Sequence, residues 1–452
     1  MDFRAVSRPY AAGSRAGGLV TSVSDNVDGP PDLTHRQWRM VVLAALGGGL
    51  EYYDFIVYGI FAQAIAAAFF PAGAPAAALT LSLAVFAVGY LARPLGGMVS
   101  SHFGDRYGRK TVFVVTVFTM SLCTLAIGLI PTYAQWGLAA TLLLVLLRFV
   151  QGLCIGGELP GAITFVVETA QRRPGFACGI VFALVNAGVL LAAFVNLALG
   201  AWLPPEAMLD YGWRIAFLFG GVLGLVSFWL RRNLEETPEF LRIRHDAAQQ
   251  PVREVVRDHR GAILLGCCVV ALTAGFNGLL FAHMPAYLGQ VLAYPRQEVA
   301  IAMNVALLAM SLSLLAASWL ADRMPPQRLL RASSLLLIVG GPMGYALLAR
   351  GDADLLLVLP LLAIAVAGAN GSFAYLLARL FPARVRFSGV ALSLNISFTL
   401  LSGLGPLAAN ALIDATGWRA APGLIVGAVA LIGLAASFAS RGAGVSRSDA
   451  RG

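Results

Sequence analysis

Charged side chains are scarce in this chain. Asp, Glu, Lys and Arg together make up 12% of its 452 residues, about half of the quarter that is usual in soluble proteins. Hydrophobic residues make up 58%, and 49 glycines add to the apolar share. A soluble globular protein could not bury so much apolar surface, and a disordered chain is excluded for the same reason. The composition indicates a protein that crosses a membrane several times.

The sequence also lacks the motifs of common catalytic and metal-binding sites. It has no nucleotide-binding P-loop, no Gly-x-Ser-x-Gly or His-Glu-x-x-His motif and no Cys-x-x-Cys pair. Its five cysteines lie inside apolar runs without the spacing of a metal site or a disulfide framework: Cys123, Cys154, Cys178, Cys267 and Cys268. We therefore expect no cofactor, no resident metal and no enzyme activity.

The basic residues give no sign of nucleic-acid binding, although the formal net charge is +9. Nearly all of them are arginines, with Lys110 the only lysine, and they lie in short links between apolar runs. They do not alternate with aromatic residues on a soluble face. We expect the lipid bilayer, and not a nucleic acid, to be their surroundings.

Twelve apolar runs are long enough to cross a bilayer, which takes roughly 20 helical residues. We place them at about 40–70, 77–103, 109–130, 136–167, 176–203, 212–231, 260–290, 298–321, 328–349, 354–380, 386–413 and 419–440. Arginine gathers in the links after the even-numbered runs, whereas links such as 131–135 carry no charge. By the positive-inside rule, the basic links and both termini face the cytoplasm.

The longest internal link divides the runs into two sets of six. We expect a disordered cytoplasmic tail at 1–38, a first half at 39–231, a charged cytoplasmic linker at 232–259, a second half at 260–441 and a tail at 442–452. Gly104-Asp105-Arg106 after the second run is partly repeated by Ala321-Asp322-Arg323 after the eighth. Two related halves around a central site are typical of secondary transporters. The predicted fold is an all-α membrane protein with twelve transmembrane helices in two six-helix halves.

The run Asp105-Arg106-x-Gly108-Arg109-Lys110 resembles the signature loop of the major facilitator superfamily. Gly108 permits a tight turn, and the charged side chains can pair across the bundle at the headgroup level. Because two-state transporters use salt bridges that break and re-form, we favour a gate over a purely topogenic cluster. The expected cytoplasmic gate comprises Asp105, Arg106, Gly108, Arg109, Lys110, Glu158 and Glu168. For Glu158 a role in proton handling stays open.

Four segments are similar to the metabolite:proton symporter family within that superfamily. They are Gly47–Gly59 in the first run, Ala92–Arg106 at the end of the second, Arg148–Glu158 in the fourth, and Phe381–Gly389 followed by Asn395. Members of that family import small carboxylic acids or betaine-like osmolytes together with a proton. The resemblance implies a proton-coupled symporter of the bacterial inner membrane. Arg379, where the family usually has Glu, departs from the pattern.

Four charged residues, Glu51, Asp54, Arg148 and Glu158, fall inside the predicted spans. A charge at a helix centre costs about 2.5–3.5 kcal/mol, so these side chains must face the bundle interior, pair or be neutralised. Glu51 and Asp54 are three residues apart and share a helix face, which Tyr58 extends. Two such carboxylates can hold and release a proton near neutral pH, so we assign proton coupling to them. The alternative is that they only brace the helix.

Arg148 stays charged at any relevant pH. It can clamp a substrate carboxylate with two N–H groups, or it can pair with a carboxylate of the first span. The expected substrate-binding residues are Arg148, Gln151, Tyr58, Asn277, His283, Tyr287 and Asn395. The alternatives are a permanent ion pair for Arg148 and hydrogen bonds between helices for the others.

The function that fits these residues is proton-coupled uptake of a small organic acid, with one, two or three carboxyl groups, by alternating access. The partners would be this substrate, the proton and the bilayer, and we expect a monomer. A zwitterionic osmolyte such as betaine or proline is an alternative substrate. Efflux is an alternative direction, because residues do not set the gradients, although the fifth span lacks the Gly-Pro-rich signature of drug:proton antiporters.

Overall fold

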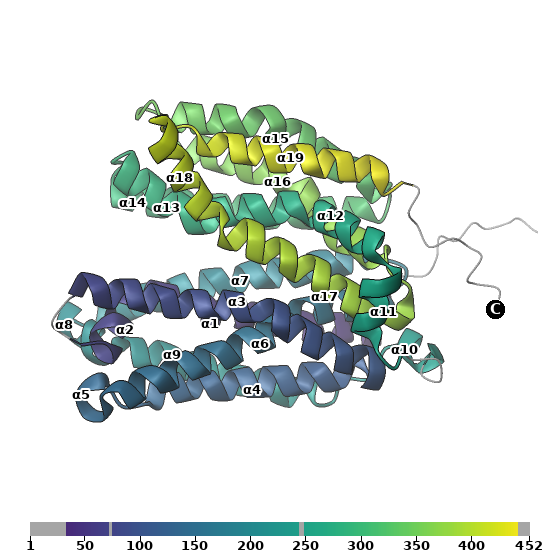
Figure 1. The fold of residues 1–452 in the computed structure, drawn as a ribbon, viewed down its shortest axis with the longest axis horizontal. Coiled ribbons are helices and arrows are strands. Elements are labelled where there is room, and N and C mark those ends of the chain that lie inside the picture. The colour runs from purple at the N-terminus through teal and green to yellow at the C-terminus, as the bar shows by residue number, and fades with distance from the viewer. Residues whose placement is uncertain (1–32, 72–74, 244–247, 442–452) are drawn as a thin grey trace, which may run out of the picture. The chain divides into compact units, whose positions relative to one another are not determined.

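The computed structural model describes residues 33–71, 75–243 and 248–441. Within these ranges every regular element is helical (Figure 1). Twelve of the described helical segments are long and apolar enough to cross a membrane. The predicted fold class is therefore confirmed. Residues 1–32 of the tail expected at 1–38, and the whole tail expected at 442–452, lie outside the described residues.

The long helices follow the order of the predicted spans. The first half holds α1 (His35–Ile60), α3 (Pro75–Tyr107), α4 (Arg109–Leu129), α6 (Leu138–Thr169), α7 (Pro174–Trp202) and α9 (Trp213–Arg231). The second half holds α12 (Arg260–Gly278), α14 (Arg296–Ala321), α15 (Pro326–Leu348), α16 (Leu355–Ala378), α17 (Arg386–Ser397) and α19 (Pro422–Ala439). In Figure 1 the second half, teal-green to yellow, lies above the first half, purple to teal, and α17 reaches down beside the first half.

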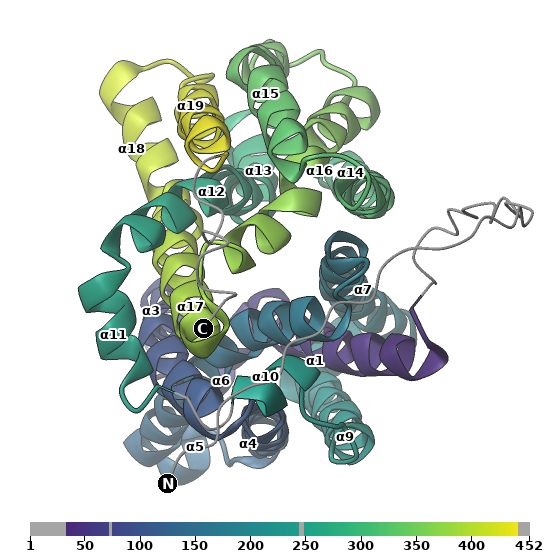
Figure 2. The same ribbon diagram turned by 90° about the vertical axis from the view of Figure 1, so that its right-hand side faces the viewer.

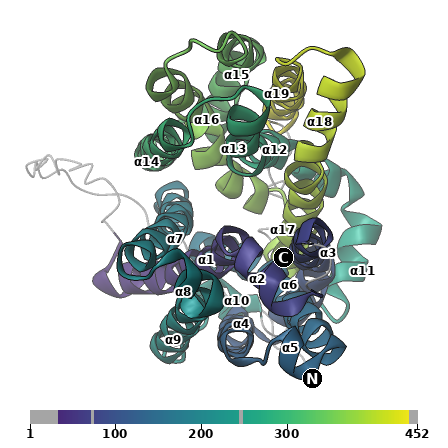
Figure 3. The ribbon, with the colours of Figure 1, turned by 90° about the vertical axis from the view of Figure 1, so that its left-hand side faces the viewer.

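Short elements extend or connect these helices. In the first half they are α2 (Ala62–Phe69), α5 (Tyr133–Trp136), α8 (Pro205–Ala207) and the π-helical η1 (Met208–Gly212). In the second half they are η3 (Leu279–His283), α13 (Met284–Ala286), η4 (Tyr287–Val291), η5 (Ala383–Val385), η6 (Phe398–Gly403) and α18 (Gly405–Thr416). The linker forms α10 (Pro238–Ile243) and α11 (Pro251–Asp258). Figure 2 views the helices from the end where α10 and α11 lie, here called the linker end, and Figure 3 views them from the opposite end.

The first helix begins earlier than the sequence pattern predicts. The Thr34 hydroxyl accepts a hydrogen bond from the Gln37 N–H at 3.3 Å, and the Gln37 side chain accepts one from the Thr34 N–H at 2.9 Å. This capping box starts α1 at His35, so residues 35–38 belong to the helix and not to the tail. The helix ends at Ile60, and the run expected at 40–70 is therefore divided between α1 and α2.

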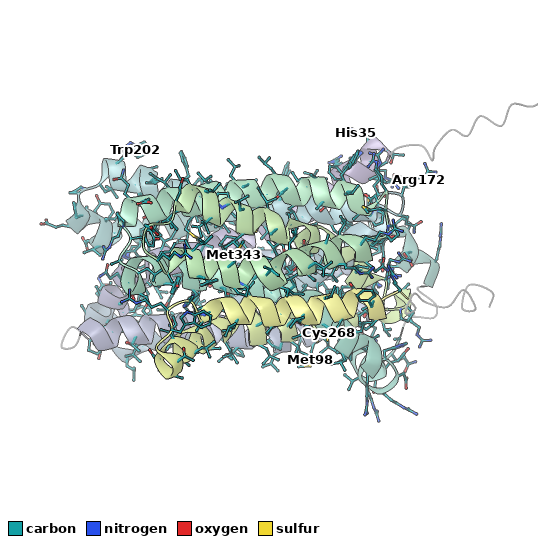
Figure 4. The ribbon with its side chains drawn as sticks, turned by 90° about the horizontal axis from the view of Figure 1, so that it is seen from above. His35, Met98, Arg172, Trp202, Cys268 and Met343 are labelled. Atoms are coloured by element: carbon teal, nitrogen blue, oxygen red, sulfur yellow. The ribbon has the colours of Figure 1, made fainter. Side chains whose placement is uncertain are left out.

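Large apolar side chains remain exposed along the middle of the helices. Met343 is 57% exposed and lies midway between the two ends in Figure 4. Trp202 marks one end of the bundle, and His35 and Arg172 mark the linker end. This distribution suits a lipid-facing surface, in which apolar side chains cover the core and tryptophan lies at an interface.

Glycines allow the closest helix contacts in the first half. A Cβ atom at Gly156 would overlap the carbonyl oxygen of Arg93, and one at Gly96 would overlap that of Leu153, so α3 and α6 pack backbone to backbone. Small residues at helix interfaces are typical of membrane proteins. The halves meet where α17 packs on α3 and α6, and where α7 packs on α14 and α16 (Figure 2).

Replacing Gly156 by alanine tests this packing. We expect Gly156→Ala to lower the melting temperature, because overpacking a tight contact costs typically 1–3 kcal/mol. Gly200→Ala is the matched control, since a Cβ atom there meets nothing within 4 Å. Thermal unfolding followed by size-exclusion chromatography in detergent measures both variants. Equal stability of the two would contradict the close α3–α6 contact.

Candidate functional site

A chain of polar side chains runs through the interior of the first half. On α1, Asp54 is only 5% exposed, and its Oδ2 accepts a hydrogen bond from the Thr124 hydroxyl of α4 at 2.6 Å. Gln151 of α6 donates to the same hydroxyl oxygen at 2.8 Å. Arg148 in turn donates from Nη1 to Gln151 Oε1 at 3.1 Å. Arg148 and Asp54 are therefore linked through two neutral side chains.

Arg148 keeps part of its hydrogen-bonding capacity unused. Its guanidinium carbon lies 3.6 Å from the centroid of the Tyr58 ring, a cation–π contact. The Tyr58 hydroxyl donates to the carbonyl oxygen of Ser82 at 3.1 Å, so Tyr58 holds Arg148 with its ring alone. Nε and Nη2 of Arg148 have no hydrogen-bond partner among the described residues, although the side chain is only 2% exposed. These two N–H-bearing atoms form a fork that suits a carboxylate.

Glu51 is buried and has no hydrogen-bonded partner. The side chain is 3% exposed, and neither carboxyl oxygen meets a donor in the described part of the chain. Together with Asp54 and Glu158, it lines a cavity of about 10 Å³, close to the smallest volume that holds a water molecule. Arg93 attracts the Glu51 carboxylate most strongly among the surrounding charges, and Glu158 repels it. The predicted pair of carboxylates is thus placed together on one face of α1.

Sequence reasoning missed Arg93, which is buried in α3. Its guanidinium carbon lies 5.6 Å from the centroid of the Tyr90 ring and 5.7 Å from that of the Phe398 ring of the second half. Nε and Nη2 have no partner within the described ranges. The sequence alone could have indicated this residue, because Arg93 is a charged residue inside the apolar run 77–103. It lies where the two halves meet.

Among the predicted residues of the second half, Asn395 reaches the first half. Its side-chain nitrogen donates to the carbonyl oxygen of Gly156 at 2.8 Å, which joins α17 to α6. Asn277 stays within its own half and accepts a hydrogen bond from Asn370 at 3.4 Å. Asn395 therefore lies at the interface between the halves, whereas Asn277 forms its hydrogen bond within the second half.

The fold does not bring His283 and Tyr287 close to the hydrogen-bonded side chains that link Asp54 to Arg148 in the first half. Nε2 of His283 is 3.0 Å from Oδ1 of Asn410, and the Tyr287 hydroxyl donates to the carbonyl oxygen of Arg419 at 2.8 Å. The two rings stack with centroids 5.3 Å apart. Both side chains thus have partners near the end of the second half that lies opposite the linker end.

At the linker end, Asp105 ties α3 to the second half. Its carboxylate accepts hydrogen bonds from the backbone N–H groups of Phe387 at 3.3 Å and Ser388 at 2.9 Å, in the first turn of α17. A helix N-terminus attracts an anion in this way. Arg109 lies 3.3 Å from the same carboxylate and 3.1 Å from that of Glu168. All three charged side chains of the first half are fully buried here.

Glu168 extends this cluster to the linker and the second half. It accepts a hydrogen bond from the Thr237 hydroxyl at 2.7 Å and pairs with Arg386 at 3.3 Å. Glu236 accepts from the backbone N–H groups of Arg109 and Lys110, which begins α4. The predicted residues Asp105, Arg109 and Glu168 are therefore brought together, and Lys110 joins them through its backbone.

Three other predicted gate residues play different structural parts. Gly108 has φ of 114°, a conformation that favours glycine and makes the turn between α3 and α4. Arg106 is exposed and lies over the Tyr107 ring, with their centres 5.2 Å apart. Glu158 lies away from the cluster, inside the first half, where it pairs with Arg231.

The second half carries a counterpart of Asp105. Asp322, which follows α14, accepts hydrogen bonds from the N–H groups of Gly175 at 2.7 Å and Phe176 at 2.9 Å, at the start of α7. Burial raises the pKa of Asp322, and these two N–H groups oppose the shift. Arg379, by contrast, is exposed. The second half thus repeats the aspartate cap, while Arg379 stands where Glu168 stands in the first half.

Comparison with known proteins gives a consistent result. The family model described as Major Facilitator Superfamily matches residues 44–395. A citrate-proton symporter of Klebsiella pneumoniae is 33% identical over 394 residues, which are 86% of this chain and 89% of that protein. The glycine betaine/proline/ectoine/pipecolic acid transporter OusA of Dickeya dadantii is 31% identical over 412 residues, or 88% of this chain and 82% of that protein.

A solved structure shares the fold. The proton:xylose symporter XylE, bound to 6-bromo-6-deoxy-D-glucose, superposes with a TM-score of 0.75 at 16% sequence identity. The match covers 88% of this chain and 94% of that chain. At this level of identity the likeness concerns the arrangement of the helices.

Cys178 offers a native reporter for the aspartate caps, because it is buried in α7 two residues beyond Phe176. In a variant without the other four cysteines, we expect Asp322→Ala to raise the rate of Cys178 labelling by N-ethylmaleimide about 5- to 30-fold, since losing a cap costs roughly 1–2 kcal/mol. Asp354→Ala is the control, because it removes the cap of α16 at the opposite end. Equal labelling in both variants would show that Asp322 does not hold the linker end together.

Proposed function

The chain belongs to the Major Facilitator Superfamily, and on that premise we propose that it takes up a small organic acid together with a proton. It is a membrane transporter and not an enzyme. One observation carries the proposal: the interior of the bundle holds both carboxylate oxygens without donors, on Glu51 and Asp54, and arginines with unused N–H groups.

The proton is assigned to the carboxylates of α1. Glu51 and Asp54 share a face and a cavity, and ionising both without a full set of partners would be costly in a membrane interior. A bound proton removes one of the two charges and relieves their repulsion. Uptake of the proton thus changes the charge of the site by one, which is what coupling to a proton gradient requires.

The substrate is assigned to the arginines. Arg148 and Arg93 each have two nitrogen atoms without partners among the described residues. A guanidinium binds a carboxylate through two parallel hydrogen bonds. Two such groups in one bundle favour an anion with one or more carboxylates, in line with the citrate-proton symporter among the relatives.

A zwitterionic osmolyte is the second candidate substrate. Relatives that transport betaine and proline are 31–32% identical to this chain. A carboxylate on an arginine and a quaternary or secondary ammonium near Glu51 would use the same buried charges. The two candidates differ in net charge, so they can be separated by a panel of substrates.

We assign alternating access to the two halves, with boundaries at 39–231 and 260–441 and the linker at 232–259. The hydrogen bonds that Asp105 and Asp322 accept from backbone N–H groups tie the halves together at the linker end. By the distribution of arginine, that end and both termini face the cytoplasm of a bacterial cell, across the inner membrane. Opening toward the cytoplasm then requires these caps to break, and a single chain carries all of the parts.

Uptake into proteoliposomes is the direct test. With an inward proton gradient, we expect accumulation of one labelled acid from a panel of citrate, 2-oxoglutarate, shikimate, benzoate, betaine and proline, and a protonophore should abolish it. Accumulation of betaine or proline alone would select the osmolyte. Faster loss of preloaded compound, with no accumulation of any, would overturn uptake in favour of efflux.

The carboxylates are tested by Glu51→Gln and Asp54→Asn. We expect both variants to lose gradient-driven accumulation, because an amide neither binds nor releases the proton in this pH range. Asp414→Asn is the control, since Asp414 is exposed near the end of the second half. Wild-type accumulation in both amide variants would remove these residues from the coupling mechanism.

The arginine is tested by Arg148→Gln. We expect the KM for the transported acid to rise about 10- to 100-fold, because a hydrogen bond to a charged group contributes about 1.5–3 kcal/mol. Initial rates of uptake measure it, and Arg350→Gln at an exposed position is the control. An unchanged KM would mean that Arg148 only braces the bundle.

A further inference from the structure

Glu158 and Arg231 form a buried ion pair that the assignments above do not use. We propose that the coupled proton crosses inside the first half, passing from Glu51 through the shared cavity to Glu158 and leaving at the end of α9 beside Arg231. The inference rests on the proposed function, because it names the route of the proton that symport requires.

The cavity joins the donor to the acceptor. Its walls come from α1, α4, α6 and α9, all in the first half, and its polar lining residues are Glu51, Asp54, Glu158, Thr116 and Ser121. The volume of about 10 Å³ suits one water molecule. Both oxygens of Glu51 and Oδ1 of Asp54 are without donors in the described chain, so the carboxyl groups of α1 are available to this space.

Glu158 is held as an acceptor at the far side of the cavity. Its Oε2 accepts a hydrogen bond from the Thr116 hydroxyl at 2.9 Å, and its Oε1 accepts one from Arg231. Arg231 also donates to the carbonyl oxygens of Leu43 and Ala44 on α1. A movement of α1 against α9 therefore loosens the hold of Arg231 on Glu158, and the Glu158 carboxylate can then take the proton.

Arg231 leads to the linker end. It is the last residue of α9, and Arg232 next to it is exposed. Glu236, five residues beyond Arg231, contacts the first residues of α4 at that end. On the opposite side of the cavity, the chain Asp54–Thr124–Gln151–Arg148 continues toward the other end of the bundle. Polar groups thus line the first half from Arg148 to Arg231.

The step moves one proton and no electrons. An O–H bond of the Glu51 carboxylic acid breaks as the intervening water gains a proton, and that water gives up another proton to a carboxylate oxygen of Glu158. When Arg231 pairs with Glu158 again, the new O–H bond breaks and water at the linker end takes the proton. The charges that act on Glu51 come from several of the elements packed around it. α3 contributes Arg93, α6 contributes Glu158, α9 contributes Arg231 and α1 itself contributes Asp54. The sequence of α7 has no charged residue, and α4 supplies the hydroxyl groups of Thr116 and Ser121.

The proton route is separate from the space between the halves. The residues that line the cavity all belong to the first half, whereas Arg93 and Asn395 make their contacts across the interface at Phe398 and Gly156. A substrate that passes between the halves does not need to share the proton's exit. Binding and exchange of substrate can therefore continue when that exit is blocked.

The test compares accumulation with exchange in Glu158→Gln, using labelled citrate and labelled betaine as probes in proteoliposomes. Accumulation driven by a proton gradient requires the proton to leave, and we expect it to fall at least tenfold. Counterflow exchange, with unlabelled probe inside and no gradient, requires no net proton movement, and we expect it to stay within twofold of wild type. Glu206→Gln is the matched control, since Glu206 is exposed at the opposite end.

Each outcome is decisive. Wild-type accumulation in Glu158→Gln overturns the route, and an equal loss of accumulation and exchange in a folded variant makes Glu158 only structural. If Glu158→Gln does not fold, Glu158→Asp is measured, and its shorter acid must slow accumulation more than exchange. If the wild type accumulates another compound of the uptake panel instead of citrate or betaine, that compound is the probe. A wild-type protein that accumulates none of the six compounds under a gradient overturns the proposed function, and with it the premise of this inference.

Discussion

A charge buried in a membrane-spanning helix needs a partner, because hydrocarbon offers none. This constraint determines how the first half is assembled. Asp54 accepts from α4, and Glu158 accepts from α4 and α9, so each bond sets how one helix faces the next. Glu51 and Arg93 are the least completely paired, because both oxygens of Glu51 and two nitrogen atoms of Arg93 lack hydrogen-bond partners within the described chain. The proposed function uses these two incompletely paired groups together with Asp54 and Arg148.

The halves are joined by a different kind of interaction. Asp105 of the first half binds the start of α17, and Asp322 of the second half binds the start of α7. The approximate repeat is therefore reciprocal, with each half supplying one carboxylate and one helix end. In the first half, the buried ion pairs of Glu168 with Arg109 and Arg386 lie beside the Asp105 cap.

The sequence predicts the fold well, because long apolar runs specify membrane helices whatever their partners. It also places Glu51 and Asp54 on one face, since that depends only on local spacing. The partner of Glu158 lies 73 residues away at Arg231, and no local pattern indicates such a contact. Arg93 could have been found, because a charge inside an apolar run is visible in the sequence.

The aspartate caps determine which substitutions the contact between the halves can accept during evolution. The groups that bind Asp105 and Asp322 are main-chain N–H groups, which every residue except proline carries. No second charged side chain is needed at these helix starts. The Asp322 lock does need a residue without a Cβ atom at Gly175, because a Cβ atom there would lie 2.7 Å from the carboxylate. Each lock therefore takes its charge from one aspartate alone, and a substitution that leaves these N–H groups and Gly175 in place keeps the same closure.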